Sequence, residues 1–185
     1  MISYEFNGYD WPLTCKTGTE QSPINLNSGF ASANTSLAIR AKAFEKITIG
    51  KVRRTATNIA MDIPTGQFDI IDPLGAYTEY DSWEAVIKSP SEHTVDGLTY
   101  DAELQLMFKK KGGASKNEVA GVSIFFDGTS GGRMTNEFID SLNLEKVGAN
   151  TETAQELQKG DTWDAKNVDV PALLEKMGSS TYWSY

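Results

Sequence analysis

Glu92-His93-Thr94-Val95-Asp96-Gly97 and Glu103-Leu104-Gln105-Leu106-Met107-Phe108 are the two runs that decide the fold class. The second run starts with alternating polar and apolar residues, which is the period of a β-strand with one buried face. Asp96-Gly97 is a typical two-residue hairpin turn. We therefore expect the segments on either side of this turn to lie side by side and antiparallel.

Further runs of the same kind lie on both sides of this pair. Residues 47–49, 59–63 and Val119–Phe126 also indicate strands, and Gly- or Pro-containing turns separate them. Helices are expected only at residues 136–144 and 171–177, with Pro171 in a first turn and Gly178 as a C-terminal cap. The sequence thus predicts one mainly β (α+β) domain over residues 1–185.

The composition narrows the range of partners. Of the 185 residues, 17 are Lys or Arg and 25 are Asp or Glu, which gives a formal net charge of -8. So acidic a chain is a poor match for nucleic acid or an anionic membrane surface. The longest apolar run, Val119–Phe126, is far shorter than the roughly 20 residues that cross a bilayer. We expect neither nucleic-acid binding nor a membrane span.

The chain has one cysteine, Cys15, and one histidine, His93, which restricts its chemistry. A zinc site normally takes three or four ligands from His, Cys and carboxylates, and these two residues cannot supply the familiar sets. A serine nucleophile would need His93 as its general base, but no Gly-x-Ser-x-Gly elbow presents such a serine at a sharp turn from a strand into a helix. Cys15 alone is compatible with a buried thiol, an intermolecular bridge, or a partner cysteine missing from this sequence.

Three segments, in order along the chain, resemble the α-class carbonic anhydrases. The segments are Gln21-Ser22-Pro23-Ile24-Asn25-Leu26, Ser89-Pro90-Ser91-Glu92-His93-Thr94-Val95-Asp96-Gly97 with Tyr100 and Glu103-Leu104, and Tyr182-Trp183-Ser184-Tyr185. The resemblance implies a large, twisted, mostly antiparallel sheet with a few short helices. In this family the central strands hold a catalytic zinc through three histidines.

The resemblance also places the zinc ligands. The first two histidines of the family, separated by one residue, fall on Val86 and Lys88, and the third falls on Gln105. None of these side chains is an imidazole, so we expect no cofactor and no carbonic anhydrase activity. A proton-shuttle histidine would fall near Thr57 or Asn58, where this chain also has no histidine.

The resemblance assigns roles to the residues around the lost ligands. Glu92 and Glu103 match glutamates that lie beside the zinc site of the family without binding the metal, and His93 matches a buried structural histidine for which Tyr185 is a candidate partner. One hypothesis is that the Lys88 ammonium partly replaces the charge of the metal and pairs with Glu103 or Glu92. The alternative is that Lys88 extends to solvent.

The family continues beyond the segment that matches Tyr182-Trp183-Ser184-Tyr185. We therefore expect that the sequence lacks a C-terminal portion of the domain, including the cysteine that would pair with Cys15 in exported members. If the shorter chain is natural, a protein partner should cover the exposed sheet edge. Cys15 as a buried thiol stays open.

These observations favour a catalytically inactive carbonic anhydrase-like protein that serves as a structural or binding subunit. One alternative is an enzyme with a relocated metal site, built from Glu79, Asp81, Glu84 or Glu103 with His93. Another is a binder of bicarbonate or a small ligand, lined by the aromatic residues Tyr77, Tyr80 and Trp83. The resemblance favours secretion or an organelle lumen, the thylakoid lumen included.

Overall fold

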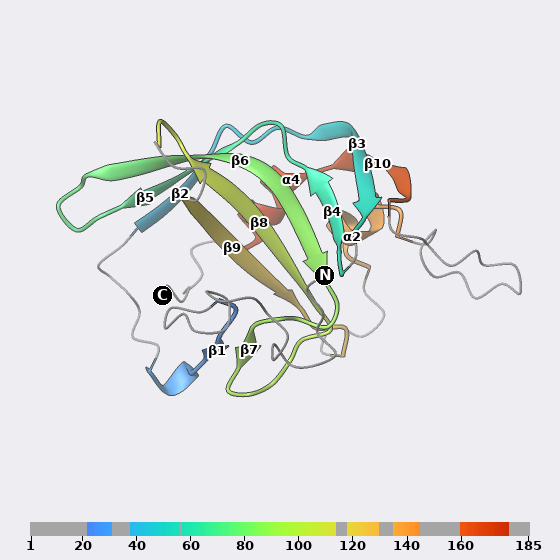
Figure 1. Ribbon diagram of the computed structural model, residues 1–185, viewed down its shortest axis with the longest axis horizontal. Helices are drawn as coiled ribbons and strands as arrows, with labels where there is room; N and C mark the ends of the chain where they lie inside the picture. Colours follow the sequence, from blue (N-terminus) through green and yellow to red (C-terminus); the bar gives the residue numbers. More distant parts are fainter. Residues whose placement is uncertain are drawn as a thin grey trace, which may run out of the picture.

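The described part of the chain is built around one large β-sheet (Figure 1). The computed structural model describes residues 22–30, 38–55, 57–113, 118–129, 135–144 and 160–177. Cys15, Gly178 and Tyr185 lie outside these residues, as do Gln21 of the first matching segment and the whole of the last one.

Eight strands of the described residues form the main sheet, in the order β10-β3-β4-β6-β5-β2, with β8 between β6 and β9. All of their pairings are antiparallel. The strands are β2 (Ala38–Lys42), β3 (Ile47–Arg54), β4 (Ile59–Asp62), β5 (Gln67–Ile71), β6 (Tyr77–Lys88), β8 (Ala102–Lys110), β9 (Val119–Phe126) and β10 (Thr162–Val168). The shorter elements are β1 (Asn25–Leu26), η1 (Ser28–Phe30), β7 (Thr94–Val95), α2 (Glu137–Ser141) and α4 (Val170–Met177).

Strand β6 is the central strand of the sheet and pairs with three other strands. One of its edges pairs with β8, and the other pairs first with β5 and then with β4. The register against β8 shifts at Trp83, because Ser82 lies opposite Phe108 and Glu84 lies opposite Met107. This β-bulge changes which alternate residues of β6 face each side of the sheet.

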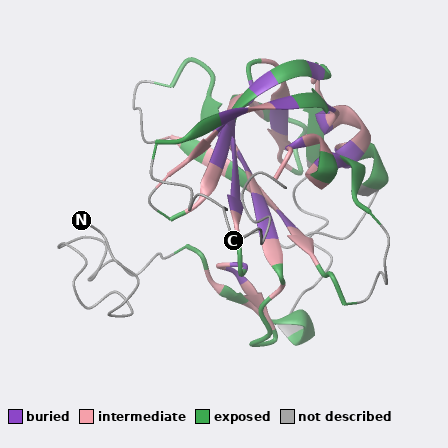
Figure 2. Cartoon of the chain, turned by 90° about the vertical axis from the view of Figure 1, so that its right-hand side faces the viewer, coloured by how far each residue is buried: buried purple, intermediate pink, exposed green. Residues whose placement is uncertain are grey.

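One face of the sheet carries the apolar core. Leu104, Leu106 and Phe108 of β8 are at most 1% exposed, and the Phe108 ring stacks on Phe68 with ring centroids 5.0 Å apart. Side chains of α2, α4 and β10 join the same apolar cluster. Figure 2 shows this buried band along the strands and beneath the helices. The opposite face of β8 carries Glu103 and Gln105.

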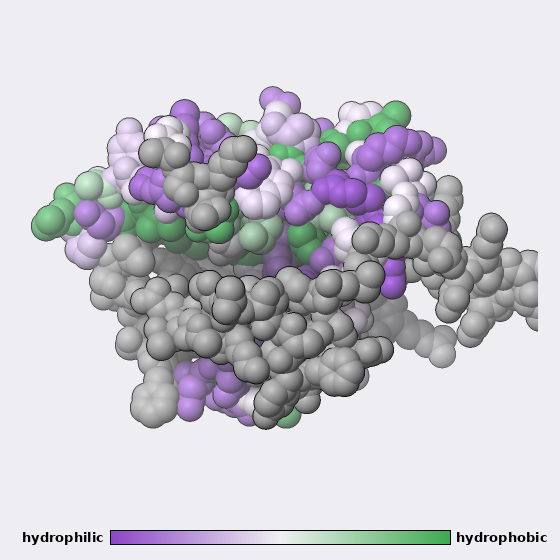
Figure 3. All heavy atoms as spheres, viewed as in Figure 1, coloured by the Kyte–Doolittle hydropathy of each residue, from purple (hydrophilic) through white to green (hydrophobic). Residues whose placement is uncertain are grey.

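The β5–β6 hairpin projects from one end of the sheet (Figure 1), and apolar side chains gather there (Figure 3). Leu74 in its turn is 94% exposed, and Tyr77 at the start of β6 is 59% exposed. No helix among the described residues combines the length and the apolar character needed to cross a membrane.

The structure confirms the mainly β class and most of the predicted elements. Strand β9 has the expected bounds, β3 and β8 extend the predicted runs, and β4 ends one residue before its predicted run does. Both helices are present, with Pro171 in the first turn of α4 and Asn136 capping the shorter helix α2. Strands β2, β5, β6 and β10 were not predicted, although residues 162–166 of β10 alternate polar and apolar side chains.

The prediction of antiparallel strands beside Asp96-Gly97 holds only close to the turn, where Val95 and Leu98 form an antiparallel bridge and the Ser91 N–H donates to the Tyr100 carbonyl at 3.0 Å. The tight turn itself is present, since Asp96 and Gly97 have φ of 51° and 78° and Val95 and Leu98 exchange two backbone hydrogen bonds. The flanking segments do not continue as a hairpin, however. Strand β7 pairs in parallel with β1, and β8 pairs with β6 and β9. The reason is that β6 and β9 each offer β8 a long ladder, whereas β7 is two residues long.

Candidate functional site

The three positions that the resemblance assigned to zinc ligands converge on one face of the sheet. Val86 on β6 lies directly opposite Gln105 on β8, and Lys88 lies two residues further along β6. Directly opposite residues and residues two apart on a strand share a face. This face is opposite to the apolar core, and we call it the site face.

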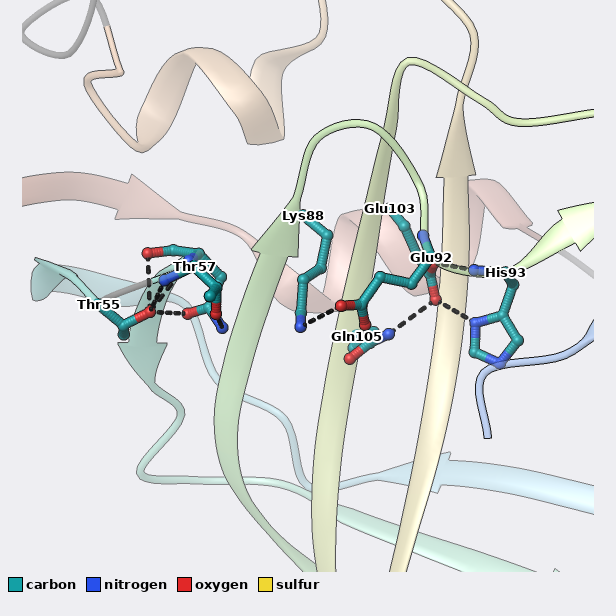
Figure 4. Close-up of polar contacts among 8 residues, drawn as sticks. Thr55, Thr57, Lys88, Glu92, His93, Glu103 and Gln105 are labelled. Carbon is teal, nitrogen blue, oxygen red and sulfur yellow. Dashed lines mark hydrogen bonds and ion pairs between the residues drawn. The ribbon is translucent and has the colours of Figure 1, made fainter. Parts of the chain in front are cut away.

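Lys88 forms an ion pair on the site face. Its Nζ lies 2.8 Å from Oε1 of Glu92, and the two side chains are only 12% and 18% exposed. Glu92 is one of the two carboxylates expected as its partner. Figure 4 shows the lysine reaching from the end of β6 toward this glutamate. The alternative of a lysine extended into solvent does not match this contact.

Glu103 is the centre of the polar network beside this pair. The residue is fully buried, and its two carboxylate oxygens accept hydrogen bonds from four nitrogen atoms. The donors are Gln105 Nε2 at 3.0 Å and His93 Nδ1 at 2.6 Å to Oε1, and the backbone N–H groups of Glu92 at 2.9 Å and His93 at 3.0 Å to Oε2. Burial by itself would raise the pKa of Glu103, but hydrogen bonds, led by that of Gln105, lower this pKa from 4.5 to about 2. Glu103 is therefore an anion at neutral pH.

His93 lies in the core of this network and not at its rim. It is 6% exposed, and its ring meets the ring of Phe125 edge-on at 6.4 Å between centroids. Its backbone carbonyl accepts a hydrogen bond of 2.7 Å from the Ser91 hydroxyl. This environment agrees with the structural role that the resemblance implies, although the expected contact with Tyr185 lies outside the described residues.

Ser123 is a member of the network that the sequence did not reveal. It lies on β9 directly opposite Gln105, and its hydroxyl donates a hydrogen bond to the Glu103 carboxylate. In the sequence it stands within an apolar run, and only the register of β8 against β9 brings it to Glu103. No local pattern could have identified it.

The position expected for a proton shuttle holds a self-contained turn. Thr55 Oγ1 donates to Asn58 Oδ1 at 2.6 Å and accepts from the Asn58 backbone N–H at 3.0 Å. The close-up in Figure 4 places this turn, with Thr57, apart from the Lys88 network. A threonine hydroxyl and an amide do not titrate near neutral pH, unlike an imidazole.

The carboxylates considered for a relocated metal site do not gather around His93, with the exception of Glu103. Glu79 pairs with Lys42 at 2.9 Å, Glu84 pairs with Arg53, and Asp81 accepts from Gln67. Within the part of the chain that is described, no three His, Cys, Asp or Glu side chains are arranged to hold a metal ion. The geometry therefore gives this alternative no support.

The three aromatic residues considered as a ligand-binding wall point in different directions. Tyr77 is largely exposed on the projecting hairpin. Tyr80 lies opposite Phe68 and packs against the apolar core. Trp83 stands at the bulge with the Lys109 ammonium over its ring, 4.1 Å from the centroid. They do not line one common pocket.

The sequence and the fold of this chain have counterparts in known proteins. The sequence profile of the eukaryotic-type carbonic anhydrases matches residues 7–185. This chain belongs to that carbonic anhydrase family. No curated protein sequence matches it significantly.

Solved structures show the same carbonic anhydrase fold. Dioscorin, in a structure complexed with ascorbate, has a TM-score of 0.62 and 25% identity over 85% of this chain and 59% of its own. An α-carbonic anhydrase of Aspergillus oryzae gives 0.66 and 17%, over 89% and 62% of the two chains. A carbonic anhydrase of Chlamydomonas reinhardtii in complex with acetazolamide gives 0.62 and 22%, over 86% and 61%. The chain thus spans about three fifths of the length of these structures.

The donor set on the site face does not suit a zinc ion. Val86 has no donor atom, Gln105 offers a neutral amide, and Lys88 brings a positive charge that would repel a divalent cation. The Lys88–Glu92 contact also engages one of the nearby carboxylates. The residues present therefore do not fit the metal that the family implies.

Proposed function

We propose that this member of the carbonic anhydrase family does not hydrate CO2 and serves as a binding or structural subunit. The observation that carries the proposal is the Lys88 ammonium, which stands beside Val86 and Gln105 on the site face and is paired with Glu92. These are the positions to which the resemblance assigns the three zinc ligands.

The reaction needs a cation because water is a weak acid. A catalytic zinc lowers the pKa of bound water from 15.7 to about 7 and so supplies hydroxide at neutral pH. An ammonium can donate a hydrogen bond to water, but it offers no vacant coordination position. Neither Glu92 nor Glu103 is suited to replace the metal, since one is held by Lys88 and the other is saturated with donors.

A direct test measures the zinc content and the CO2 hydration rate of the purified chain. We expect no stoichiometric zinc and no hydration above buffer. The triple variant Val86→His, Lys88→His, Gln105→His should bind about one zinc, because the three side chains already share one face. The double variant Val86→His, Gln105→His keeps the ammonium and should not bind it tightly. Wild-type protein that holds zinc and hydrates CO2 would overturn the proposal.

A subunit role is supported by the exposed apolar hairpin and by strand β9. Leu74 and Tyr77 project into solvent, and among the described strands β9 pairs with β8 alone. The proposed partner is a protein outside the cytoplasm, in keeping with the location that the resemblance favours. The association of this chain with its partner can be followed by light scattering in extracts of the native compartment. The variant Leu74→Ser, Tyr77→Ser should lose this association. An unchanged association would remove the hairpin surface from the proposal.

A second candidate function is the binding of a small ligand on the site face. The structure of dioscorin with ascorbate favours it, because that similar fold accommodates a small molecule. Ascorbate is therefore the first compound to titrate, by calorimetry under reducing conditions. Heat that saturates at one equivalent would support this function, and no heat at millimolar ascorbate would count against it.

A further inference from the structure

Two polar groups on the site face, the Lys88 ammonium and the Gln105 amide oxygen, can form further hydrogen bonds. The Lys88 ammonium has three N–H donors and directs one of them to Glu92. The Gln105 amide donates from Nε2 to Glu103, which turns its oxygen away from that carboxylate. Within the described ranges, Lys88 Nζ makes no second hydrogen bond and Gln105 Oε1 accepts none.

Both groups keep part of their surface exposed. The Lys88 side chain is 12% exposed and Gln105 is half-buried. Val86, at 8% exposed, lies opposite Gln105 and presents an alkyl surface beside them. The site face therefore combines a cationic donor, an amide acceptor and an apolar contact. Diagonal neighbours on paired strands, such as Lys88 and Gln105, lie roughly 7 Å apart.

Glu103 cannot respond to a ligand, but Glu92 can. Four N–H groups and the Ser123 hydroxyl already hold the buried Glu103 carboxylate in place. Glu92 is 18% exposed, so its carboxylate can turn toward water and leave the ammonium to another anion. An incoming carboxylate would thus exchange with Glu92 and would not add a second negative charge to the same contact.

We propose that the site face binds a short 2-hydroxy carboxylate, with the carboxylate on Lys88 Nζ and the hydroxyl donating to Gln105 Oε1. This assignment rests on the proposed non-catalytic binding function. A carboxylate without a hydroxyl would leave the Gln105 oxygen without its donor. A neutral alcohol could not replace Glu92 at the ammonium.

Calorimetric titration of the full chain with glycolate and acetate, at low ionic strength, tests the proposal. We expect glycolate to bind at one equivalent and several-fold more tightly than acetate. Lys88→Met should lower the affinity for glycolate at least about tenfold, because a charge-assisted hydrogen bond is lost. Lys51→Met removes an equal charge from a 69% exposed lysine on β3 and should leave the affinity unchanged.

Two further variants separate the parts of the site. Gln105→Met should reduce the affinity for glycolate to that for acetate and leave acetate itself unaffected. Glu92→Gln should strengthen the binding of both acids, because it removes the carboxylate that competes for Lys88. Thermal unfolding of each variant verifies that it is folded. A variant that fails to fold is replaced by the reciprocal measurement, glycolate protection of Lys88 from acetylation in the wild-type chain.

Three results would overturn the assignment: no glycolate heat at millimolar concentration, unchanged affinity in Lys88→Met, or equal affinity for glycolate and acetate. Zinc content and CO2 hydration are measured on the same preparation. If glycolate fails to bind and the chain is inactive and free of zinc, only this assignment falls. If the chain binds zinc and hydrates CO2, the non-catalytic function falls as well.

Discussion

At the scale of single residues, Glu103 shows how a buried charge is tolerated in this protein. A carboxylate with no exposed surface is unfavourable unless donors surround it, and here three side chains and two backbone N–H groups supply them. The same contacts tie the segment after β6 to β8. Glu103 therefore contributes to the fold of the site face whether or not that face binds anything.

Glu103→Gln should destabilise the fold by about 2–4 kcal/mol, because the amide introduces N–H donors that face the existing donors. Chemical denaturation at pH 7 measures the loss. The matched control is Glu118→Gln, which breaks an exposed pair with Lys110 and should cost at most about 1 kcal/mol. Equal losses in the two variants would contradict the central role of Glu103.

The pH dependence of stability follows from the same residue. The folded pKa of Glu103 is about 2, below the ordinary 4.5, so the unfolded chain binds this proton more readily. The stability that Glu103 contributes is complete above about pH 4.5 and is lost as the pH falls toward 2, at about 1.4 kcal/mol per pKa unit. The free energy of unfolding should therefore fall less steeply in Glu103→Gln than in wild type across this window, and parallel profiles would refute the assignment.

At the scale of elements, the bulge in β6 decides which side chains reach the site face. Before Trp83 the odd-numbered residues of β6 face the site side, and after it Glu84, Val86 and Lys88 do. Ala85 and Ile87 then face the core, where they are 3% and 9% exposed. One extra residue thus sorts the second half of the strand between the polar network and the apolar core.

Deletion of Trp83 should remove the bulge and leave the faces of β6 unchanged, because Ser82 and Glu84 already lie opposite consecutive residues of β8 and would then alternate regularly. The variant should therefore still fold and unfold cooperatively. The measurement is cooperative thermal unfolding by near-ultraviolet circular dichroism. Trp83→Ala keeps the residue count and the bulge, so it should unfold cooperatively at a lower temperature. A deletion variant that loses cooperative unfolding would contradict the assignment of Trp83 as the one extra residue of β6.

At the scale of the whole molecule, the fold is held by its apolar face and the site face is held by hydrogen bonds. The core cluster runs from β8 and β9 through β3 and β10 to both helices. The site face carries the Lys88–Glu92 pair and the Glu103 network, which need no metal to satisfy their charges. A protein built in this way should fold without a divalent cation.

Chelation should therefore leave the melting temperature unchanged. A ligand present at one hundred times its Kd would add about 2.7 kcal/mol, which in a chain of this length raises the melting temperature by several degrees. Differential scanning calorimetry with EDTA, and then with excess zinc, measures both directions. The triple histidine variant provides the positive control, and a zinc-dependent rise in the wild-type chain would contradict the prediction.

The sequence by itself determined the fold class and the family, and its resemblance to that family singled out three positions on the site face. Alternation marked β8 and β9, the motif that begins at Ser89 pointed to Val86 and Lys88, and the run Glu103-Leu104-Gln105-Leu106 pointed to Gln105. These signals are local, because they depend on period and spacing along one segment.

Only the tertiary structure decided which segments pair and which charges meet. The partners of β8 and the approach of Ser123 to Glu103 depend on the register between paired strands. The choice of Glu92 for Lys88 depends on how the segment after β6 folds back toward that strand. A one-residue change of register moves every side chain of a strand to the other face. Because long-range packing of the apolar core sets that register, no local pattern in the sequence contains it.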